Sequence, residues 1–327
     1  MKLPITFRRS AAALALGLCS CLCSSWALAA YPDQPIKLIV PFPAAGSTDL
    51  VARAVAAELS TILGQNIIVD NRAGAGSLIG SELVAKAPAD GYTILMAGLT
   101  NVFLPYIHKN LNWSPIDDFA PIGLVADLPN VIAVNASGPY KTLAELVKAD
   151  KARPGLMSFG SAGIATPSHL VCEMVNNKSD IKLVHVPYKG NAPAVQDLMA
   201  GHIPVMCNNL GGTLPFMTSG KIRILAQTGK SRSAAVPDVP TFAELGISGL
   251  DAGLWMGLVA PKSTPKDVLN TLNQALAKAL ALPALKEKLA KLGASPLSSA
   301  PAAFNERVLA DKKAWDPVLK TLDLKTN

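Results

Sequence analysis

The sequence predicts an α/β protein of two domains, each a mainly parallel sheet flanked by helices. Mostly apolar segments of strand length, such as residues 36–40 and 93–97, alternate with segments whose apolar residues recur every three to four positions. This alternation is typical of parallel sheets that are covered by helices. The chain has 327 residues, a length that favours two domains.

The first thirty residues predict a secretory signal peptide. A basic start is followed by an apolar run over residues 11–23 and by the small-residue cleavage motif Ala27-Leu28-Ala29. The apolar run is shorter than the roughly 20 residues that a membrane-spanning helix needs. Leu18-Cys19-Ser20-Cys21 loosely resembles a lipoprotein cleavage motif, but Cys19 is unfavourable at its second position. We therefore expect a soluble mature protein in the periplasm.

The first half of the mature chain is expected to contain three strands and two helices. The apolar residues of 48–63 form one helical stripe, which Gly64 ends. Gly74-Ala75-Gly76-Ser77 is expected to begin a second helix that ends near residue 87. The strands are expected at residues 36–40, 67–69 and 93–97.

The second half repeats the pattern. A capping box at Thr142 and the pair Thr166-Pro167 each predict the start of a helix, and a further helix is expected over 192–200. Strands are expected at residues 131–134, 156–159, 182–186, 203–206, 222–226 and 254–260. After the last strand we expect only helices, which begin at Ser263-Thr264-Pro265, at Pro283 and near Ala300.

The order of elements predicts how the chain divides. Helices without strands of their own should pack on a sheet that is already built. We therefore expect residues 31–127 and 252–327 to form one domain and residues 128–251 the other. Two crossings of ordered chain would make a hinge and leave a cleft between the domains.

Two turns rich in glycine and hydroxyl residues, 41–49 and 159–166, each connect a predicted strand to a predicted helix. A helix N-terminus exposes unpaired N–H groups and the positive end of the helix dipole, so it can hold an anion. Helix capping accounts for one or two hydroxyl groups, but not for Ala44-Ala45-Gly46, whose small side chains let a ligand reach the main chain. We interpret the turns as two sides of a site for a small acid.

The sequence predicts no cofactor, no metal and no nucleic-acid partner. Gly74, Gly76 and Gly80 lack the spacing of a dinucleotide-binding turn, and no P-loop is present. His169 and Cys172 lie three residues apart without further metal ligands, and we expect His169 to have a core or capping role. The formal net charge is +7, but basic residues do not cluster and only 5% of residues are aromatic.

An exported hydrolase that uses Ser161 or Cys172 as its nucleophile is an alternative. It requires a base within hydrogen-bond reach of that hydroxyl or thiol. No G-x-S-x-G motif is present. We therefore expect a binding protein and not an enzyme.

Cys172 and Cys207 are the two cysteines outside the leader. They could form a disulfide in an oxidising compartment. Each lies in an apolar segment, however, where a buried free thiol is the commoner state. The sequence alone favours two free thiols.

Ordered motifs along the mature chain resemble one family. They are Tyr31-Pro32-Asp33-Gln34-Pro35-Ile36, Val40-Pro41-Phe42-Pro43-Ala44-Ala45-Gly46-Ser47-Thr48-Asp49, Val69-Asp70-Asn71-Arg72-Ala73-Gly74-Ala75-Gly76, Asp90-Gly91-Tyr92, Asp118-Phe119-Ala120-Pro121-Ile122, Gly160-Ser161-Ala162-Gly163, His169-Leu170, Val186-Pro187-Tyr188-Lys189-Gly190 and Pro237-Asp238-Val239-Pro240-Thr241. They resemble the Bug family, the periplasmic solute-binding proteins of tripartite tricarboxylate transporters.

The resemblance implies a two-domain Venus-flytrap fold of the type II binding-protein class. It also implies a monomeric receptor that delivers a small organic acid to a permease with two transmembrane subunits. A sensor with a signalling partner in place of the permease is an alternative. The resemblance and the turns together give the expected ligand-binding residues, which are Phe42, Ala44, Ala45, Ser47, Thr48, Asn101, Ser161, Thr166, Tyr188 and Asn208.

Three departures from the family pattern bear on the ligand. Ala45 stands where a second glycine is common, and Leu99 and Phe103 lie in a stretch that is usually more polar. Asn208 stands where many members have an acidic residue, whose charge would favour an amino group. We therefore expect a plain carboxylate, either a dicarboxylate or an aromatic acid. The apolar Leu99 and Phe103 are expected to leave room for an aromatic acid.

Overall fold

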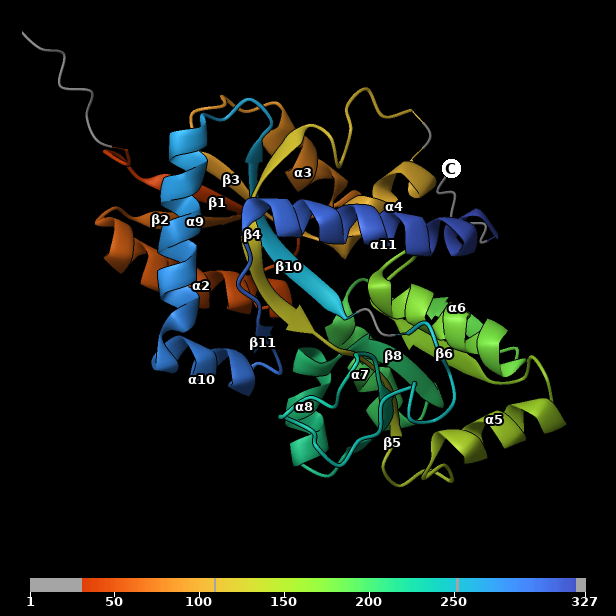
Figure 1. Cartoon of the computed structure of the whole chain (residues 1–327). Helices are drawn as coiled ribbons and strands as arrows, with labels where there is room; N and C mark the ends of the chain where they lie inside the picture. The colour runs from red at the N-terminus through yellow and green to blue at the C-terminus, as the bar shows by residue number, and fades with distance from the viewer. Residues whose placement is uncertain (1–30, 109, 251–252, 322–327) are drawn as a thin grey trace, which may run out of the picture. The chain divides into compact units, whose positions relative to one another are not determined.

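The strands form two sheets in a computed structural model that describes residues 31–108, 110–250 and 253–321 (Figure 1). The predicted signal peptide lies outside the described residues. The six-stranded sheet has the order β11-β4-β10-β3-β1-β2, and the five-stranded sheet has the order β7-β6-β8-β5-β9. The α/β fold class is therefore confirmed.

The six-stranded sheet takes its strands from both ends of the chain. They are β1 (Ile36–Val40), β2 (Ile67–Asn71), β3 (Thr93–Gly98), β4 (Phe119–Leu128), β10 (Leu254–Pro261) and β11 (Ser295–Pro296). β1 pairs in parallel with β2 and β3, whereas β10 runs antiparallel to both β3 and β4. The short strand β11 was missed, because we expected only helices after β10.

The five-stranded sheet comes from the middle of the chain. Its strands are β5 (Asn130–Asn135), β6 (Ser158–Ser161), β7 (Val184–Pro187), β8 (Val205–Asn209) and β9 (Ile222–Gln227). β6 is parallel to β7 and β8, but β5 is antiparallel to β8 and β9. Both sheets are thus mixed rather than mainly parallel. β5 and β10, the strands that the chain enters after crossing from the other sheet, each run antiparallel to both of their neighbours.

Helices cover both faces of the six-stranded sheet. They are α2 (Ser47–Leu63), the short η1 (Ala75–Ser77), α3 (Leu78–Ala85), α4 (Leu99–Ile107), α9 (Lys266–Ala281), α10 (Pro283–Lys291) and α11 (Pro301–Thr321). A Cβ on Gly257 of β10 would overlap Phe304 of α11. On the neighbouring strand, a Cβ on Gly123 would meet Leu276 of α9. Since Gly257 pairs with Leu124, α11 and α9 lie on opposite faces.

The helices of the five-stranded sheet are α5 (Leu143–Ala152), α6 (Pro167–Ser179), α7 (Asn191–Ala200) and α8 (Leu210–Thr218). β8 runs to Asn209, three residues beyond the predicted strand, because Asn208 and Asn209 continue the pairing with β5 and are buried there. The strand was predicted to end too early because these two side chains are polar.

Cys172 of α6 and Cys207 of β8 form a disulfide, so the expectation of two free thiols was wrong. Both cysteines are fully buried, and the bond ties the helix to the central strand of its sheet. The apolar segments correctly indicated burial. They did not reveal that α6 packs directly on β8.

The chain passes between the sheets at Pro129, which joins β4 to β5, and again after β9, before β10 begins at Leu254. The two passages are held together, because the backbones of Asn130 and Thr228 are hydrogen-bonded at 2.8 Å. The division into domains 31–127 with 252–327 and 128–251 stays a prediction.

Candidate functional site

The first predicted turn is held by the buried carboxylate of Asp49. Its Oδ2 accepts hydrogen bonds from the backbone N–H of Ala45 at 2.9 Å and from Nε of Arg53 at 3.0 Å. The amide of Asn71 donates to Oδ1 of Asp49 and to the carbonyl of Phe42. Burial alone would raise the pKa of Asp49, but the hydrogen bonds from Arg53, Ala45 and Asn71 outweigh it and lower that pKa. The network fixes the main chain where a ligand is expected.

Helix α2 starts from this turn without a capping side chain. Its N-cap is Gly46, which has no side chain to accept from the first N–H groups. Ala45 precedes it with a positive φ of 63° and, like Ala44, is exposed. Ser47 is half-buried and Thr48 is buried. The N–H groups at the start of α2 are therefore suited to an anion.

The second predicted turn is satisfied mostly by its own groups. The hydroxyl of Thr166, the N-cap of α6, donates to the carbonyl of Gly163 at 2.8 Å and accepts from the N–H of His169. The N–H of Ala165 donates to Nδ1 of His169. The expected capping role of His169 is therefore confirmed, and this turn has fewer free donors than the first.

Ser161 makes a contact that the sequence did not indicate. Its Oγ lies 2.6 Å from Nε2 of His185 and 3.1 Å from the carbonyl oxygen of Gly163. His185 stacks between neighbours, with ring centroids 3.8 Å from His169 and 4.9 Å from Phe159. Burial, together with the nearby His169, lowers the pKa of His185 to about 4, so the ring is neutral near pH 7.

Tyr188 supports the second turn through its ring and backbone. The ring lies over Gly160, whose Cβ, if present, would be 3.0 Å from the ring. The Tyr188 hydroxyl donates to Asp197 at 2.6 Å. Burial and this hydrogen bond raise the pKa of Tyr188 to about 12. The hydroxyl is thus already engaged within the protein.

A chain of contacts connects the two turns through the N-termini of α7 and α8. A Cβ on Gly211 of α8 would lie 3.5 Å from Cβ of Ser47 in the first turn. A Cβ on the next residue, Gly212, would lie 3.3 Å from Nδ2 of Asn191, the first residue of α7. The N–H of Gly190 then donates to the carbonyl of Ala162 in the second turn. The N-termini of α2, α8 and α7 therefore follow one another between the turns.

Asn208 lies near the end of β8, two residues before α8 begins at Leu210. Its side chain is fully buried, and its Oδ1 accepts from the N–H of Asn209 at 2.8 Å. Among the described residues, Nδ2 of Asn208 has no hydrogen-bond partner. The predicted site residue thus presents an unused donor beside the helix N-termini.

Both polar atoms of the Asn101 side chain are hydrogen-bonded within the protein. Its Oδ1 accepts from the N–H of Gly98, and its Nδ2 donates to Ser81 at 3.1 Å. Leu99 and Phe103 of the same helix are buried in the core, with Phe103 edge-on to Trp315 at 5.3 Å. The expectation that Leu99 and Phe103 leave room for an aromatic acid was wrong. Their apolar face packs inward, as is usual for an amphipathic helix.

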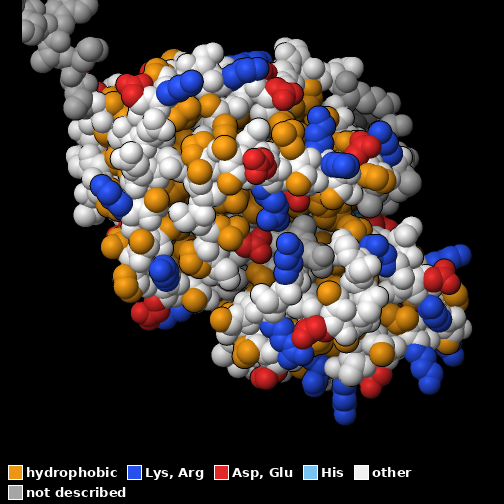
Figure 2. Space-filling view, viewed as in Figure 1, with side chains coloured by type: hydrophobic (Ala, Val, Ile, Leu, Met, Phe, Trp, Pro, Cys, Tyr) orange, Lys and Arg blue, Asp and Glu red, His pale blue; other side chains and the backbone are white. Residues whose placement is uncertain are grey.

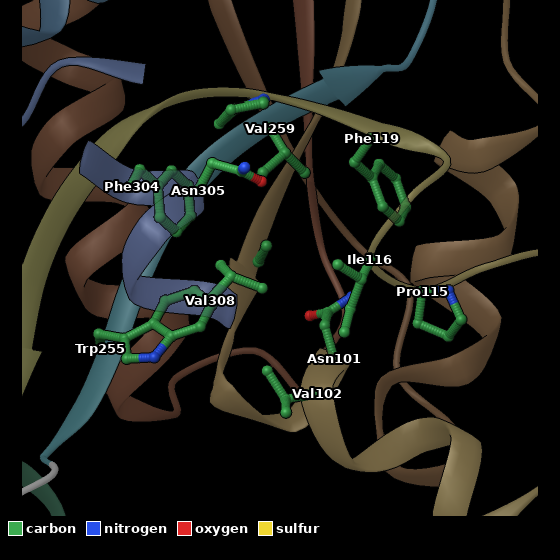
Figure 3. A pocket seen from close by; sticks show the side chains of 12 residues that line it. Asn101, Val102, Pro115, Ile116, Phe119, Trp255, Val259, Phe304, Asn305 and Val308 are labelled. Carbon is green, nitrogen blue, oxygen red and sulfur yellow. The ribbon is translucent and has the colours of Figure 1, made fainter. Parts of the chain in front are cut away.

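A small cavity of about 40 Å³ lies beside Asn101, between α4, β10 and α11 (Figure 3). Apolar side chains such as Trp255, Phe304 and Val308 point into it. Of the predicted ligand-binding residues, only Asn101 lines this cavity.

A larger hollow of about 310 Å³ lies where the chain passes between the sheets. Arg232 and Arg307 line it, but they are paired with Glu244 at 2.9 Å and with Asp311 at 2.8 Å. Figure 2 shows that basic and acidic side chains are mixed across this face of the molecule. None of the predicted ligand-binding residues lines this hollow.

Sequence reasoning missed four residues of this region: His185, Asn191, Gly211 and Gly212. The run Asn208-Asn209-Leu210-Gly211-Gly212 combines amides with glycines before a helix, and this signal could have been used. Gly190-Asn191 before the next helix is a similar signal. His185 offered none, because its contact with Ser161 depends on the pairing of β6 with β7.

Two negative findings apply to the described part of the chain. No group of three or more His, Cys, Asp or Glu residues in it is placed to hold a metal ion. Within the same residues, no helix is both long and apolar enough to cross a membrane.

Comparison with known proteins gives consistent matches. Residues 51–324 match the model of the tripartite tricarboxylate transporter family receptor. The protein of the tcbD–tcbE intergenic region of Pseudomonas sp. strain P51 is 36% identical, over 98% of this chain and 96% of its own length. BugT of Bordetella pertussis is 35% identical, over 89% of this chain and 90% of its own.

Solved structures are also similar to this chain. The periplasmic binding protein BugD has a TM-score of 0.82 at 36% identity, covering 90% of this chain and 100% of its own. Rpa4515 of R. palustris, solved with adipate, has a TM-score of 0.83 at 32% identity, over 89% and 98%. MatC of Rhodopseudomonas palustris, solved with bound malate, has a TM-score of 0.80 at 30% identity, over 88% and 100%.

Proposed function

Because the chain belongs to the tripartite tricarboxylate transporter receptor family, we propose that it captures a small organic dicarboxylate in the periplasm and delivers it to a membrane permease. The ligand would bind between the two predicted domains. The first and second turns and the N-termini of α7 and α8 would surround it. The resemblance to the Bug family is confirmed by the family model and by BugT and BugD.

One observation carries this proposal. The uncapped N-terminus of α2 lies against the N-terminus of α8, with Ser47 beside Gly211. At α8 the N–H groups of Leu210 and Gly212 are already bonded to Pro129 and Asn209, so the free N–H groups come from α2. The dipoles of both helices still favour a negative charge between them. A ligand that touches both would stabilise the closed form over the open form, and a permease could recognise that difference.

A dicarboxylate is favoured over an aromatic acid for two reasons. Leu99 and Phe103 are buried in the core and offer no aromatic pocket. The relatives solved with adipate and with malate hold dicarboxylates. The ligand-binding roles of Phe42, Ala44, Ala45, Ser47, Thr48, Ser161 and Thr166 are part of this proposal. Asn101 and Tyr188 are proposed to position the surrounding main chain.

Thermal unfolding in the presence of malate, succinate, adipate and benzoate tests the proposal. A ligand at 100 times its Kd stabilises the native state by about 2.7 kcal/mol and raises Tm. Ser47→Ala should weaken that response, whereas Thr61→Ala, at the exposed far end of α2, should leave it unchanged. If no acid raises Tm while a sugar or a cation does, the proposed ligand class is wrong.

Delivery to the permease requires a separate test. The purified receptor, loaded with a stabilising acid, should stimulate uptake of that acid by vesicles that contain the permease of the same transporter. The same receptor should have no effect on vesicles that lack the permease. Uptake that does not depend on the receptor would contradict delivery and would favour a sensor.

The contact between Ser161 and His185 favours a second candidate, a hydrolase, because it supplies a base to a hydroxyl. Two observations oppose it. The Ser161 hydroxyl donates to the carbonyl of Gly163, and Cys172 is in a disulfide and cannot act as a nucleophile. A serine-directed fluorophosphonate should leave the protein unlabelled. Labelling that is lost in Ser161→Ala would support the hydrolase instead.

A further inference from the structure

We propose that His185 is a positioning residue for the bound acid: through Ser161 it determines whether the hydroxyl of Thr166 is held by the second turn or is free to donate to a carboxylate. This inference rests on the proposed function. It gives a role to a residue of β7 that the sequence did not indicate, and it makes acid binding depend on pH.

Three donors approach the carbonyl oxygen of Gly163. The hydroxyl of Thr166 lies 2.8 Å from it, the hydroxyl of Ser161 lies 3.1 Å from it, and the backbone nitrogen of Thr166 lies 3.4 Å from it. A carbonyl oxygen has two lone pairs, so one of the three donors can leave while both lone pairs stay bonded. The backbone N–H is fixed by the chain, and the donor that can turn away is therefore a hydroxyl.

Of the two hydroxyls, that of Thr166 is the more accessible to a ligand. Ser161 is fully buried at the end of β6, whereas Thr166 is half-buried at the N-terminus of α6. Oγ1 of Thr166 also lies 3.0 Å from Oγ of Ser168, so its hydrogen already has a second acceptor within reach. A carboxylate would be a stronger acceptor than either, because hydrogen bonds to an ionised oxygen are shorter and stronger.

His185 determines whether Thr166 can turn away. The hydroxyl of Ser161 has one hydrogen, and its oxygen lies 2.6 Å from Nε2 of His185. When Nε2 carries a proton, it donates to Ser161, and the Ser161 hydrogen stays on the carbonyl of Gly163. When Nε2 carries none, it accepts the Ser161 hydrogen, and the hydroxyl of Thr166 is needed at Gly163. The first arrangement releases Thr166 for a carboxylate, and the second does not.

Protonation of His185 enforces the first arrangement, because both ring nitrogens of an imidazolium are donors. The titratable groups that act on this ring are His169 and Glu173, both on α6. Burial and His169 lower the pKa of His185 to about 4, and the negative charge of Glu173 opposes them. A carboxylate bound at the second turn adds a further negative charge nearby, which favours the protonated ring. Acid binding should therefore be coupled to proton uptake in mild acid.

Titration calorimetry with malate and adipate at pH 7 and pH 5, in buffers of different ionisation heat, tests the inference. His185→Gln keeps an amide that can bond to Ser161 but cannot be protonated. Relative to this variant, the wild-type protein should gain about two- to tenfold in affinity between pH 7 and pH 5 and should take up protons on binding. His202→Gln, at an exposed site, is the matched control and should keep both effects. Protonation of the acid itself is the same for every variant and cancels in the comparison.

Ser161→Ala separates the hydrogen-bond path from the charge of the ring. It removes the connecting hydroxyl but leaves His185 able to titrate, so the affinity gain at pH 5 should be lost. An undiminished gain in Ser161→Ala or in His185→Gln, or a wild-type protein without any gain, would overturn the positioning role. If Ser161→Ala does not fold, His185→Gln still decides the question. If the wild-type protein binds neither acid at either pH, the proposed function fails instead.

Discussion

Nε2 of His185 lies 2.6 Å from Oγ of Ser161, so an imidazole on β7 sets the direction of a hydroxyl on β6. The two strands are parallel neighbours, which brings residues 24 positions apart into contact. His169 and Phe159 stack with the imidazole and limit its movement. The second turn therefore owes its geometry to a buried aromatic stack as well as to its own hydrogen bonds.

His185 should make the protein less stable in mild acid. Its folded pKa of about 4 lies below the ordinary value of 6.5, so the unfolded chain binds a proton more readily between these values. Stability therefore falls as pH drops from about 6.5 toward 4. Urea unfolding across this range should show the decline, and His185→Gln should flatten it. His202→Gln, at an exposed site, is the control; an equal change there would contradict the prediction.

The Asp49 network should hold the first turn in place. Asp49→Ala removes an acceptor used by Ala45, Arg53 and Asn71 and should cost about 2 kcal/mol of unfolding free energy. Because the pKa of Asp49 is lowered from its ordinary value of 3.8, this contribution is fully present above that value and is lost as pH falls through the lower folded pKa. Denaturant titrations at pH 7 and pH 3 measure both effects.

Asp70→Ala is the matched control, since Asp70 pairs with Arg72 at the surface. Exposed pairs contribute about 0–1 kcal/mol. If Asp70→Ala lowers the free energy of unfolding as much as Asp49→Ala does, the prediction that the buried network stabilises the turn is contradicted.

The disulfide between Cys172 and Cys207 should stabilise the five-stranded sheet. It closes a loop with a sequence separation of 35, for which loop entropy gives about 4 kcal/mol. Cys172→Ser together with Cys207→Ser should lower the free energy of unfolding by 2–4 kcal/mol. A reductant should lower the Tm of the wild-type protein but leave that of the double variant unchanged. A reductant effect of equal size on both proteins would contradict this assignment.

Gly211→Ala should disturb the contact between α8 and the segment after α10. A Cβ there would lie 2.5 Å from the carbonyl oxygen of Leu292, too close without a backbone shift. Overpacking of this kind costs about 1–3 kcal/mol. Thermal unfolding should show the loss, and acid binding should weaken because Ser47 is adjacent. Thr218→Ala, at the exposed end of α8, should have little effect.

The alternation of strands and helices predicted most of the fold. The α/β class was correct, and α9, α10 and α11 begin within a few residues of the proline and alanine signals at 265, 283 and 300. The mixed direction of the strands was not predicted, because apolar runs do not distinguish parallel from antiparallel pairing. The end of β8 was also predicted too early, because polar residues such as its buried asparagines are more typical of a strand end.

Parts of the site could be predicted from the sequence only where all the residues involved lie in one short segment. The first turn, with Gly46 before α2, could be recognised from local residues. The position of Asn208 was also singled out. Its relation to Asn191 and Gly212 depends on how α7 packs beside α8, and the disulfide depends on how α6 packs on β8. The prediction that Leu99 and Phe103 leave room for an aromatic acid was wrong, because apolar residues near a site usually belong to the core.

The positions of the strands in the sequence also determine the order in which the two sheets can form. The five-stranded sheet draws all its strands from residues 130–227, so its pairings are available once that stretch of chain has emerged. β4, in contrast, ends at Leu128 and pairs with β10, which begins only at Leu254. Contacts between such distant segments form slowly, because a long loop must close first. During synthesis, the middle of the chain can fold first, and the edge of β4 stays open until β10 arrives.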